Sequence, residues 1–329
     1  GFKTGDLAVM GIGQVLKKLF YFLRVKKTME RAIDDWRPDV VCTVDYPGMN
    51  LKLAAYAKAR GVRAVHVVCP QVWAWKRGRI PKIEAALDRL CCFFPFEPSL
   101  FRPGFAEFVG HPLADAFASE GHGRGTSGAD GKVLALLPGS RMGEIEKHMP
   151  VLLEVIRQLS AEAERLKVVI PAANDRVHAA IASSVSRLAS SSCAVELRRG
   201  GARELLRTAD AAVVASGTAT LEAALAGCPT VLVYRVGWFF ELVARIVIRG
   251  VRHIGLANVI AEKAGAPCPM PELLQRDFTA ENVLRCVRPW LTDAEANARA
   301  RQALGETMRR LTSDGDAIGR IVSAVIRQP

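Results

Sequence analysis

The chain alternates short apolar runs with longer segments that mix apolar and polar residues. In the first third, residues 50–60 have helical composition and are closed by Gly61. Runs of strand length lie on either side of this segment and beyond it, at 39–44, 62–68, 89–94 and 107–110. Repeated alternation of strand and helix predicts parallel strands joined by right-handed helical crossovers. The pattern therefore predicts an α/β protein.

The alternation stops once and then restarts. Ser119–Gly131 holds five glycines in thirteen residues, a composition typical of a linker. Beyond it we expect strands at 132–137, 167–171, 194–197, 211–215 and 230–234, and helices at 144–159, 175–188, 219–226, 281–290, 293–311 and 316–326. Glu272 and Gln275, which follow Pro271, are expected at the start of a further helix. The sequence thus predicts two Rossmann-like domains, 1–118 and 132–329, which face each other across a cleft.

The composition limits the classes of binding partner that the chain is expected to have. A chain of 329 residues suits two cores, and 45 Lys and Arg against 33 Asp and Glu leave a net charge of +12, which favours anionic partners. The basic residues are spread along the chain without a nucleic-acid-binding motif, so nucleic acid is the weakest of these options. The eight cysteines lack short metal-type or redox spacing and are typical of reduced residues in a cytosolic protein. No apolar run reaches the roughly 18 residues of a membrane span.

Two segments combine aromatic, aliphatic and basic residues. They are Leu16–Lys27 and Trp238–Arg252. A basic amphipathic helix can rest on an anionic lipid surface, although each segment could also be an ordinary helix with one face on the core. Because the combination occurs twice, the sequence favours peripheral binding to a membrane.

The segment Asp210–Tyr234 indicates a binding site. It runs from a strand through a polar turn, Ser216-Gly217-Thr218, into a helix and a second strand. The start of a helix presents free N–H groups and a positive dipole end, which attract phosphate. Glu222, one turn inside the helix, is either an acceptor for sugar hydroxyls or an exposed helix residue.

A second turn follows the first strand of the second domain. In Pro138-Gly139-Ser140-Arg141, glycine permits close approach of the backbone, serine supplies a hydroxyl, and arginine offers two parallel donors to phosphate. The alternative is a plain turn. The segment is not a Walker loop, since the Gly-x-x-x-x-Gly-Lys pattern is absent.

The first domain carries candidates at strand ends. Asp45 follows the first strand and could take a proton from an attacking hydroxyl, or could cap the next helix. Trp73 and Trp75 could form an apolar wall for acyl chains or a sugar face, or pack in the core. His111 lies at the domain junction and is either a site residue or a structural one.

Several of these segments together resemble lipid-A-disaccharide synthase, a two-domain glycosyltransferase of the GT-B type. The likeness covers nearly the whole chain from about Leu7. It rests on Ala8–Gly11, Gln71–Trp75, Phe94–Glu97, Val109–His111, Leu136–Arg141, Ser216–Glu222 and Pro271–Gln275, in the family's order. The family normally begins with a strand and a Gly-rich loop, and no such segment precedes Leu7, so we expect that the sequence is truncated at its N-terminus.

The resemblance implies an inverting transferase of lipid A and lipopolysaccharide biosynthesis, on the cytoplasmic face of the inner membrane. It would join UDP-2,3-diacylglucosamine to 2,3-diacylglucosamine 1-phosphate, giving lipid A disaccharide 1-phosphate and UDP. Asp45 would be the catalytic base, and Arg141 would stabilise charge on the leaving diphosphate. The other implied donor-side residues are Ser140, Ser216, Gly217, Thr218, Glu222, Asn258, Glu272 and Gln275, and the acceptor or cleft side would hold Trp73, Trp75 and His111.

No cofactor and no metal are expected, since the charge of the leaving diphosphate would be neutralised by arginine and by helix N-termini. Two alternatives remain. One is another two-domain UDP-sugar enzyme, such as an epimerase or the peptidoglycan N-acetylglucosaminyl transferase. The other is a non-catalytic protein that binds a nucleotide sugar or a lipid. The sequence leaves acyl-chain length open, and also whether the protein is a homo-oligomer.

Overall fold

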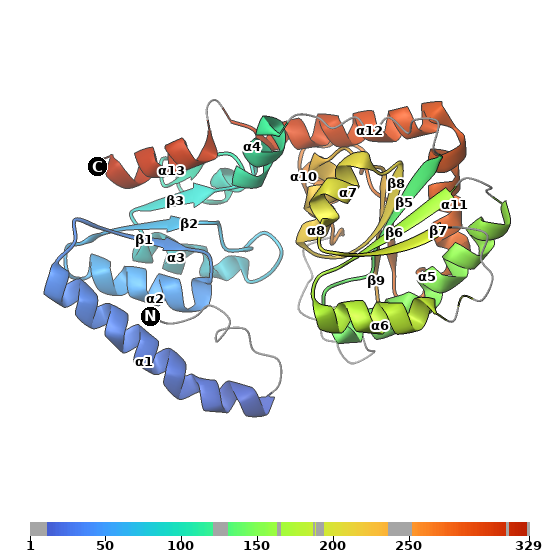
Figure 1. Cartoon of the computed structure of the whole chain (residues 1–329). Helices are drawn as coiled ribbons and strands as arrows, with labels where there is room; N and C mark the ends of the chain where they lie inside the picture. Colours follow the sequence, from blue (N-terminus) through green and yellow to red (C-terminus); the bar gives the residue numbers. More distant parts are fainter. Residues whose placement is uncertain are drawn as a thin grey trace. The chain divides into compact units, whose positions relative to one another are not determined.

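The computed structural model describes residues 12–120, 131–162, 166–186, 188, 194–235, 252–313 and 316–327 (Figure 1). Two compact units divide the chain. The first holds residues 1–110 and 313–329, and the second holds residues 111–312. Most of the predicted basic segment Trp238–Arg252 and of the predicted linker lies outside the described residues.

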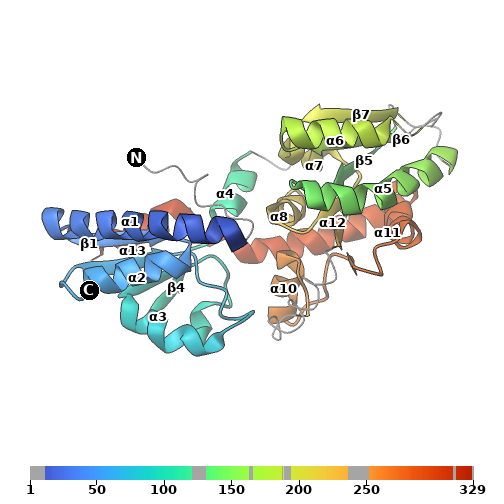
Figure 2. The same ribbon diagram turned by 90° about the horizontal axis from the view of Figure 1, so that it is seen from below.

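The first unit is built on a four-stranded parallel sheet in the order β1-β2-β3-β4. Its strands are β1 (Val40–Val44), β2 (Arg63–Val67), β3 (Arg89–Cys92) and β4 (Ala106–Phe108), and its helices are α1 (Ile12–Trp36), α2 (Pro47–Lys58), α3 (Ile80–Ala86) and α13 (Ala317–Ile326), with short 3₁₀ turns at Arg77–Arg79 and Pro98–Leu100. Both views show α1 lying along α2 (Figure 2). The predicted α/β class is confirmed.

Both faces of this sheet are covered, because successive residues of a strand point to opposite sides. Ala64 and Leu90 pack with residues of α2 and α3. Val65 and Cys91 pack on the opposite face, against Ala324 of α13. The near-continuous apolar runs that predicted these strands are the consequence of this two-sided burial.

The second unit has a six-stranded sheet in the order β10-β9-β8-β5-β6-β7, with all pairs parallel. The strands are β5 (Lys132–Leu137), β6 (Leu166–Ala172), β7 (Ala194–Arg199), β8 (Ala211–Ala215), β9 (Thr230–Tyr234) and β10 (Glu272–Leu274). The chain starts at β5 in the middle, winds out to β7, and returns through β8 to the other edge. This is the doubly wound order, in which ligands bind beyond the carboxyl ends of the strands at the switch point, here between β5 and β8.

Helices sandwich the six strands. They are α4 (Pro112–Ser119), α5 (Met142–Glu162), α6 (Asp175–Val185), α7 (Ala202–Thr208), α8 (Thr218–Leu225), α10 (Leu256–Lys263), α11 (Ala280–Thr292) and α12 (Ala294–Met308), with a 3₁₀ turn at Arg309–Leu311. Residues of α5, α6 and α11 form the core on one face of the sheet, and α7 and α8 form it on the other (Figure 1).

The division into units differs from the predicted domain bounds at both ends. Helix α4 groups with the second unit and α13 with the first, whereas the sequence placed them the other way round. Arg63 of β2 donates to the carbonyl oxygens of Val325 at 2.6 Å and Ala324 at 2.8 Å, which ties α13 to the first sheet. The apolar stripe of α13 indicates that the helix packs against a sheet, but it does not indicate which of the two sheets.

One predicted element is wrong. Glu272 and Gln275 were expected at the start of a helix after Pro271, but residues 272–274 form β10, an edge strand parallel to β9. Gln275 follows in the left-handed region with φ 52°, and its N–H donates to Tyr234 O at 2.9 Å. Three residues are too few to show the period of a strand, so only pairing with β9 decides the outcome.

Helix α1 confirms the helix predicted at Leu16–Lys27. Of its residues from Tyr21 onward, Leu23, Met29 and Trp36 are exposed, Trp36 at 82%. Lys26 pairs with Glu30 one turn later. No helix in the described part of the chain combines the length and the apolar character needed to cross a bilayer.

Candidate functional site

A cavity of about 350 Å³ lies at the switch point of the second sheet. Its floor comes from the carboxyl ends of β5, β6 and β8, and its rim from the residues where α5, α7 and α8 begin. Five residues predicted on the donor side line it together: Ser140, Arg141, Ser216, Gly217 and Thr218. Because three helices begin around one cavity, their unpaired N–H groups and positive dipole ends make it a site for an anion.

The backbone of the turn after β8 explains why residue 217 is a glycine. Gly217 has φ 150°, a backbone angle that L side chains rarely adopt, and a Cβ there would meet no atom within 4 Å. Glycine is therefore required by the backbone angle and not by crowding. Gly217 is also the N-cap of α8 and offers no side chain to the first turn, so the first N–H groups of the helix stay available for a ligand.

The turn after β5 is held by a residue that sequence reasoning missed. Glu144 Oε2 accepts from the backbone N–H of Ser140 at 3.0 Å and of Arg141 at 3.3 Å. Its Oε1 lies 3.2 Å from Arg141 Nη1, and the arginine side chain is 63% exposed. Gly139, at φ 121°, leaves room for this carboxylate, since a Cβ there would lie 2.4 Å from Glu144 Oε2. The signal was available, because a glutamate three residues after a helix N-cap is the capping-box position.

His148 is a second missed residue. Its buried ring lies in α5, with Nδ1 2.7 Å from Pro138 O, and Nε2 accepts from Arg235 N–H at 3.0 Å. Burial lowers the pKa of His148, so the neutral ring donates from Nδ1 and accepts at Nε2. The histidine thus links the turn after β5 to the end of β9. A lone histidine in an amphipathic helix gives no sequence signal for such a role.

The remaining donor-side candidates lie outside this lining. Glu222 is half-buried on α8, and burial raises the pKa of its carboxyl while the charge of Arg203 opposes the shift. Gln275 contributes its backbone: its carbonyl oxygen accepts from Arg235 Nε at 3.2 Å. The structure therefore brings five of the predicted donor-side residues into one cavity and leaves these two, as well as Asn258 and Glu272, outside its lining.

Asn258 and Glu272 form a pair of their own. The buried Asn258 donates from Nδ2 to Met270 O and to Glu272 Oε1, both at 2.8 Å, and its Oδ1 accepts from Met270 N–H at 3.0 Å. Glu272 also accepts from the N–H groups of Ile254 at 3.0 Å and Gly255 at 3.1 Å. Since the amide of Asn258 is fully engaged, its contribution in this structure is to hold Glu272. It does not cap α10, whose N-cap is Gly255.

In the first unit, Asp45 lies just beyond β1 with its side chain exposed. Its backbone is fixed in the left-handed region at φ 50°, its N–H donates to Val67 O at 2.9 Å, and its carbonyl accepts from Asn50 Nδ2 at 2.7 Å. The helix-cap alternative for Asp45 is wrong, because the N-cap of α2 is Tyr46 and no side chain bonds there. Among the described residues, its carboxylate has no hydrogen-bond partner.

His66 lies on β2 opposite Thr43 of β1 and is fully buried. Its Nδ1 is 2.8 Å from Thr43 Oγ1. Burial lowers the pKa of His66 to about 4, and the negative charge of Asp45 opposes the shift only in part. The ring is therefore neutral at physiological pH.

The acceptor-side candidates differ in exposure. Trp73 donates from Nε1 to Glu97 Oε1 at 3.1 Å and meets Phe96 edge to face, with ring centroids 5.6 Å apart. Trp75 is 38% exposed, and Lys76 Nζ lies 4.6 Å from its ring centroid. Trp73 is thus anchored, while Trp75 offers an apolar face to solvent.

His111 belongs to the second unit, where it begins α4. Its Nδ1 accepts from Leu113 N–H at 3.1 Å, and burial lowers the pKa of the ring. This contact is the structural role that the sequence left open.

Comparison with known proteins adds to this geometry. A family model described as lipid-A-disaccharide synthetase matches residues 2–315. The lipid-A-disaccharide synthase of Myxococcus xanthus is 38% identical over 324 residues, which cover 96% of this chain and 82% of that protein.

Solved structures share the fold at low identity. The chain resembles MurG of Acinetobacter baumannii with a TM-score of 0.58 and 15% identity, over 97% of this chain and 82% of that one. It resembles UDP-GlcNAc 2-epimerase of Neisseria meningitidis, solved bound to UDP-GlcNAc, with a TM-score of 0.59 and 13% identity, over 97% and 84%. At these identities the likeness shows the fold alone.

Proposed function

Because the chain belongs to the lipid-A-disaccharide synthase family and is a glycosyltransferase, we propose that it joins UDP-2,3-diacylglucosamine to 2,3-diacylglucosamine 1-phosphate. The products are lipid A disaccharide 1-phosphate and UDP. The observation that carries the proposal is the cavity at the switch point, where three helix starts, two glycine turns and Arg141 surround a space of ligand size.

The cavity holds the donor diphosphate. The first N–H groups of α8 and the hydroxyls of Ser216 and Thr218 bind phosphate oxygens, and Arg141 donates to them from its exposed guanidinium. Departure of UDP places negative charge on the diphosphate, which fixed donors stabilise. Arg141 must exchange its contact with Glu144 for the phosphate, and an exposed ion pair of this kind contributes only about 0–1 kcal/mol.

The base is Asp45. An inverting transfer needs one group to take the proton of the acceptor hydroxyl as that oxygen attacks the sugar. The carboxylate of Asp45 is exposed and uncommitted to the cap of α2, while its backbone is fixed by Val67 and Asn50. This combination positions the carboxylate and leaves its oxygens available.

The other predicted residues take supporting roles. Glu222 and Glu272 accept hydrogen bonds from the ribose or uracil side of the donor, with Asn258 holding Glu272 in place, and Gln275 completes that side. Trp75, with Trp73 behind it, contacts acyl chains on the acceptor side. His111 fixes the start of α4 near the domain junction.

The substrates carry acyl chains, so the chain binds to the cytoplasmic face of the inner membrane. Helix α1 supports this proposal, since Leu23 and Trp36 are exposed on a helix that also carries Arg24 and Lys27. Apolar side chains enter the lipid interface while basic ones attract anionic headgroups. Binding to anionic vesicles that falls as salt rises, and falls again in Leu23→Glu, tests it; equal binding to neutral vesicles would contradict it.

Release of UDP from the two diacylated substrates tests the reaction. Asp45→Ala and Arg141→Ala should each abolish turnover. Two matched variants should keep it: Asp39→Ala, just before the amino end of β1, and Arg157→Ala, on the same helix as Glu144 and paired with Glu154 at 2.5 Å. UDP binding without turnover in the unaltered chain would instead favour a binding protein, and turnover of UDP-N-acetylglucosamine alone would favour an epimerase.

A further inference from the structure

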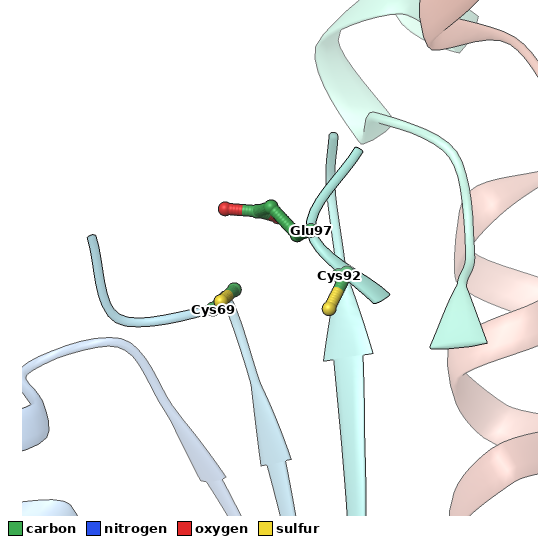
Figure 3. A group of neighbouring side chains, drawn as sticks. All are labelled: Cys69, Cys92 and Glu97. Carbon is green, nitrogen blue, oxygen red and sulfur yellow. The ribbon is translucent and has the colours of Figure 1, made fainter. Parts of the chain in front are cut away.

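Two cysteines and a glutamate lie close together in the interior of the first unit. Cys69 follows β2, Cys92 ends β3, and Glu97 lies in the turn beyond β3 (Figure 3). One ligand atom from each, the two Sγ atoms and a carboxylate oxygen, all lie within 4.8 Å of one another. The residues are 3%, 0% and 1% exposed, and the structure shows no second such trio in the part of the chain that it describes.

Without a cation, the surroundings of Glu97 and Cys69 disfavour their ionised forms. Burial raises the pKa of Glu97 to about 7, even though Phe94 N–H and Trp73 Nε1 each donate to its carboxylate at 3.1 Å. The Cys92 thiol, burial and the charge of Glu97 together raise the pKa of Cys69. A divalent cation reverses this preference, because a coordinated thiol gives up its proton.

We propose that Cys69, Cys92 and Glu97 bind one divalent cation of the zinc type. Zinc takes thiolate sulfur at about 2.3 Å and carboxylate oxygen at about 2.0–2.2 Å in a tetrahedron, so its ligand atoms lie roughly 3.5–4 Å from one another. The observed separations, all within 4.8 Å, extend beyond this spacing, so the side chains draw together when the cation binds. Pro70 O, 3.3 Å from Cys69 Sγ, supplies an oxygen for the fourth position, or water does.

The protons balance. Each thiol releases one proton to solvent when its sulfur binds the cation, and Glu97 releases one whenever it is protonated beforehand. Two thiolates, one carboxylate and a divalent cation leave one net negative charge. The N–H donors of Trp73 and Phe94 already point at the carboxylate and stabilise that charge.

The cation has a structural role. Its ligands are buried, and Glu97 is hydrogen-bonded to Trp73, so the cation would join the ends of β2 and β3 to the loop that carries both tryptophans. It takes no part in the proposed transfer, so its presence can be measured without substrates.

Titration of the reduced, metal-free full chain with Co²⁺, followed by displacement with Zn²⁺, tests the proposal. We expect one equivalent of Co²⁺ with thiolate-to-metal absorption and tetrahedral d–d bands, and release of protons on binding. The titration is run in a Cys268→Ser background, because Cys268 Sγ lies 3.2 Å from His253 Nε2 and offers another soft ligand pair.

Variants locate the site. Cys69→Ser and Cys92→Ser should each weaken Co²⁺ binding by more than about a hundredfold, and Glu97→Gln should do so by about tenfold or more, in keeping with the loss of a ligand. The matched control is Cys91→Ala, adjacent on β3 but facing Val65 and Ala324 on the other side of the sheet, which should bind normally. Circular dichroism at each step separates loss of the site from loss of the fold.

Two results would overturn the proposal. One is the absence of thiolate-to-metal absorption bands in the chain with all three ligands intact. The other is binding that survives in both Cys69→Ser and Cys92→Ser. Thermal unfolding gives an independent test of binding. We expect Zn²⁺ to raise the Tm of the Cys268→Ser chain by several degrees, and to leave the Tm unchanged when Cys92→Ser is added.

Discussion

The two parallel sheets present different chemical groups at the carboxyl ends of their strands. At the carboxyl edge of the second sheet the groups on offer are chiefly backbone N–H groups at helix starts, set by glycine turns at Gly139 and Gly217. At the carboxyl edge of the first sheet they are side chains: Asp45 in the open, and Cys69 with Glu97 in the interior. The same strand geometry thus presents mainly backbone N–H groups in one unit and side chains in the other, as the proposed binding of an anion and the proposed base would require.

This difference predicts which substitutions each of the two regions tolerates. A site made of backbone groups survives changes of neighbouring side chains but not a change of backbone angle. A site made of side chains depends on individual atoms of individual residues. Substitutions in the first unit should therefore act on the chemical step or on one bound ion, and substitutions in the turns of the second unit should act on affinity for UDP.

The largest effect is expected at Asp45. Asp45→Asn keeps the size and removes the proposed base, so kcat should fall by about 10²–10⁴-fold, the usual contribution of a general base, while the affinity for UDP stays unchanged. Single-turnover kinetics and calorimetry with UDP separate the two quantities. A loss of UDP affinity in this variant would contradict the division of labour between the units.

The next largest effect concerns acid stability of the first unit. The pKa of His66 is lowered by burial from its usual 6.5 to about 4, so between these values the unfolded chain takes up a proton that the folded chain refuses. The neutral ring of His66 therefore makes its full contribution to the free energy of unfolding above pH 6.5. This contribution falls as the pH drops to about 4, by roughly 3 kcal/mol at 1.36 kcal/mol per pKa unit.

Urea unfolding between pH 4 and 7.5 measures this slope. His66→Gln lowers stability at pH 7.5 but should flatten the pH dependence, because glutamine does not titrate. His178→Gln, at a half-buried position of α6 in the second unit, should leave the slope as it is. An unchanged slope in His66→Gln would show that other groups carry the acid sensitivity.

Much of the second unit was predictable. The strands β5, β8 and β9 have the bounds that their apolar runs predicted, because each run is buried on both sides and bounded by polar or turn residues. Ser216, Gly217 and Arg141 were predicted to bind phosphate, and the structure brings them to one cavity. Local sequence suffices there, since a glycine turn before a helix is a local feature.

What escaped prediction depends on contacts between distant segments. Cys69 and Cys92 are separated along the chain, and only the parallel register that pairs Val67 with Cys91 brings their strand ends together. His148 links two turns from different strands. Glu272 was assigned to a helix because an edge strand of three residues has no period of its own.

A smaller effect is expected at Gly217. Gly217→Ala forces a Cβ onto a residue at φ 150°, which costs about 1–3 kcal/mol unless the turn moves, so Kd for UDP should rise by about 5–150-fold with little change in kcat. Gly143→Ala, in the first turn of α5 with open space around it, should bind UDP normally. Equal losses in both variants would mean that the backbone angle is not what matters.

The smallest effect is expected at Glu144, where two consequences of one side chain can be told apart. The carboxylate holds the N–H groups of Ser140 and Arg141, but it also puts a negative charge beside the cavity proposed to receive a diphosphate. Glu144→Gln keeps an acceptor oxygen for the turn and removes the charge, so Kd for UDP should fall by about two- to fivefold, equivalent to at most about 1 kcal/mol. Glu144→Ala removes the acceptor too, so Kd should rise, and Glu146→Gln, exposed on the same helix, should change nothing. If the Gln and Ala variants weaken UDP binding alike, the charge of Glu144 is needed to hold the turn, and the second site depends on a side chain as closely as the first does.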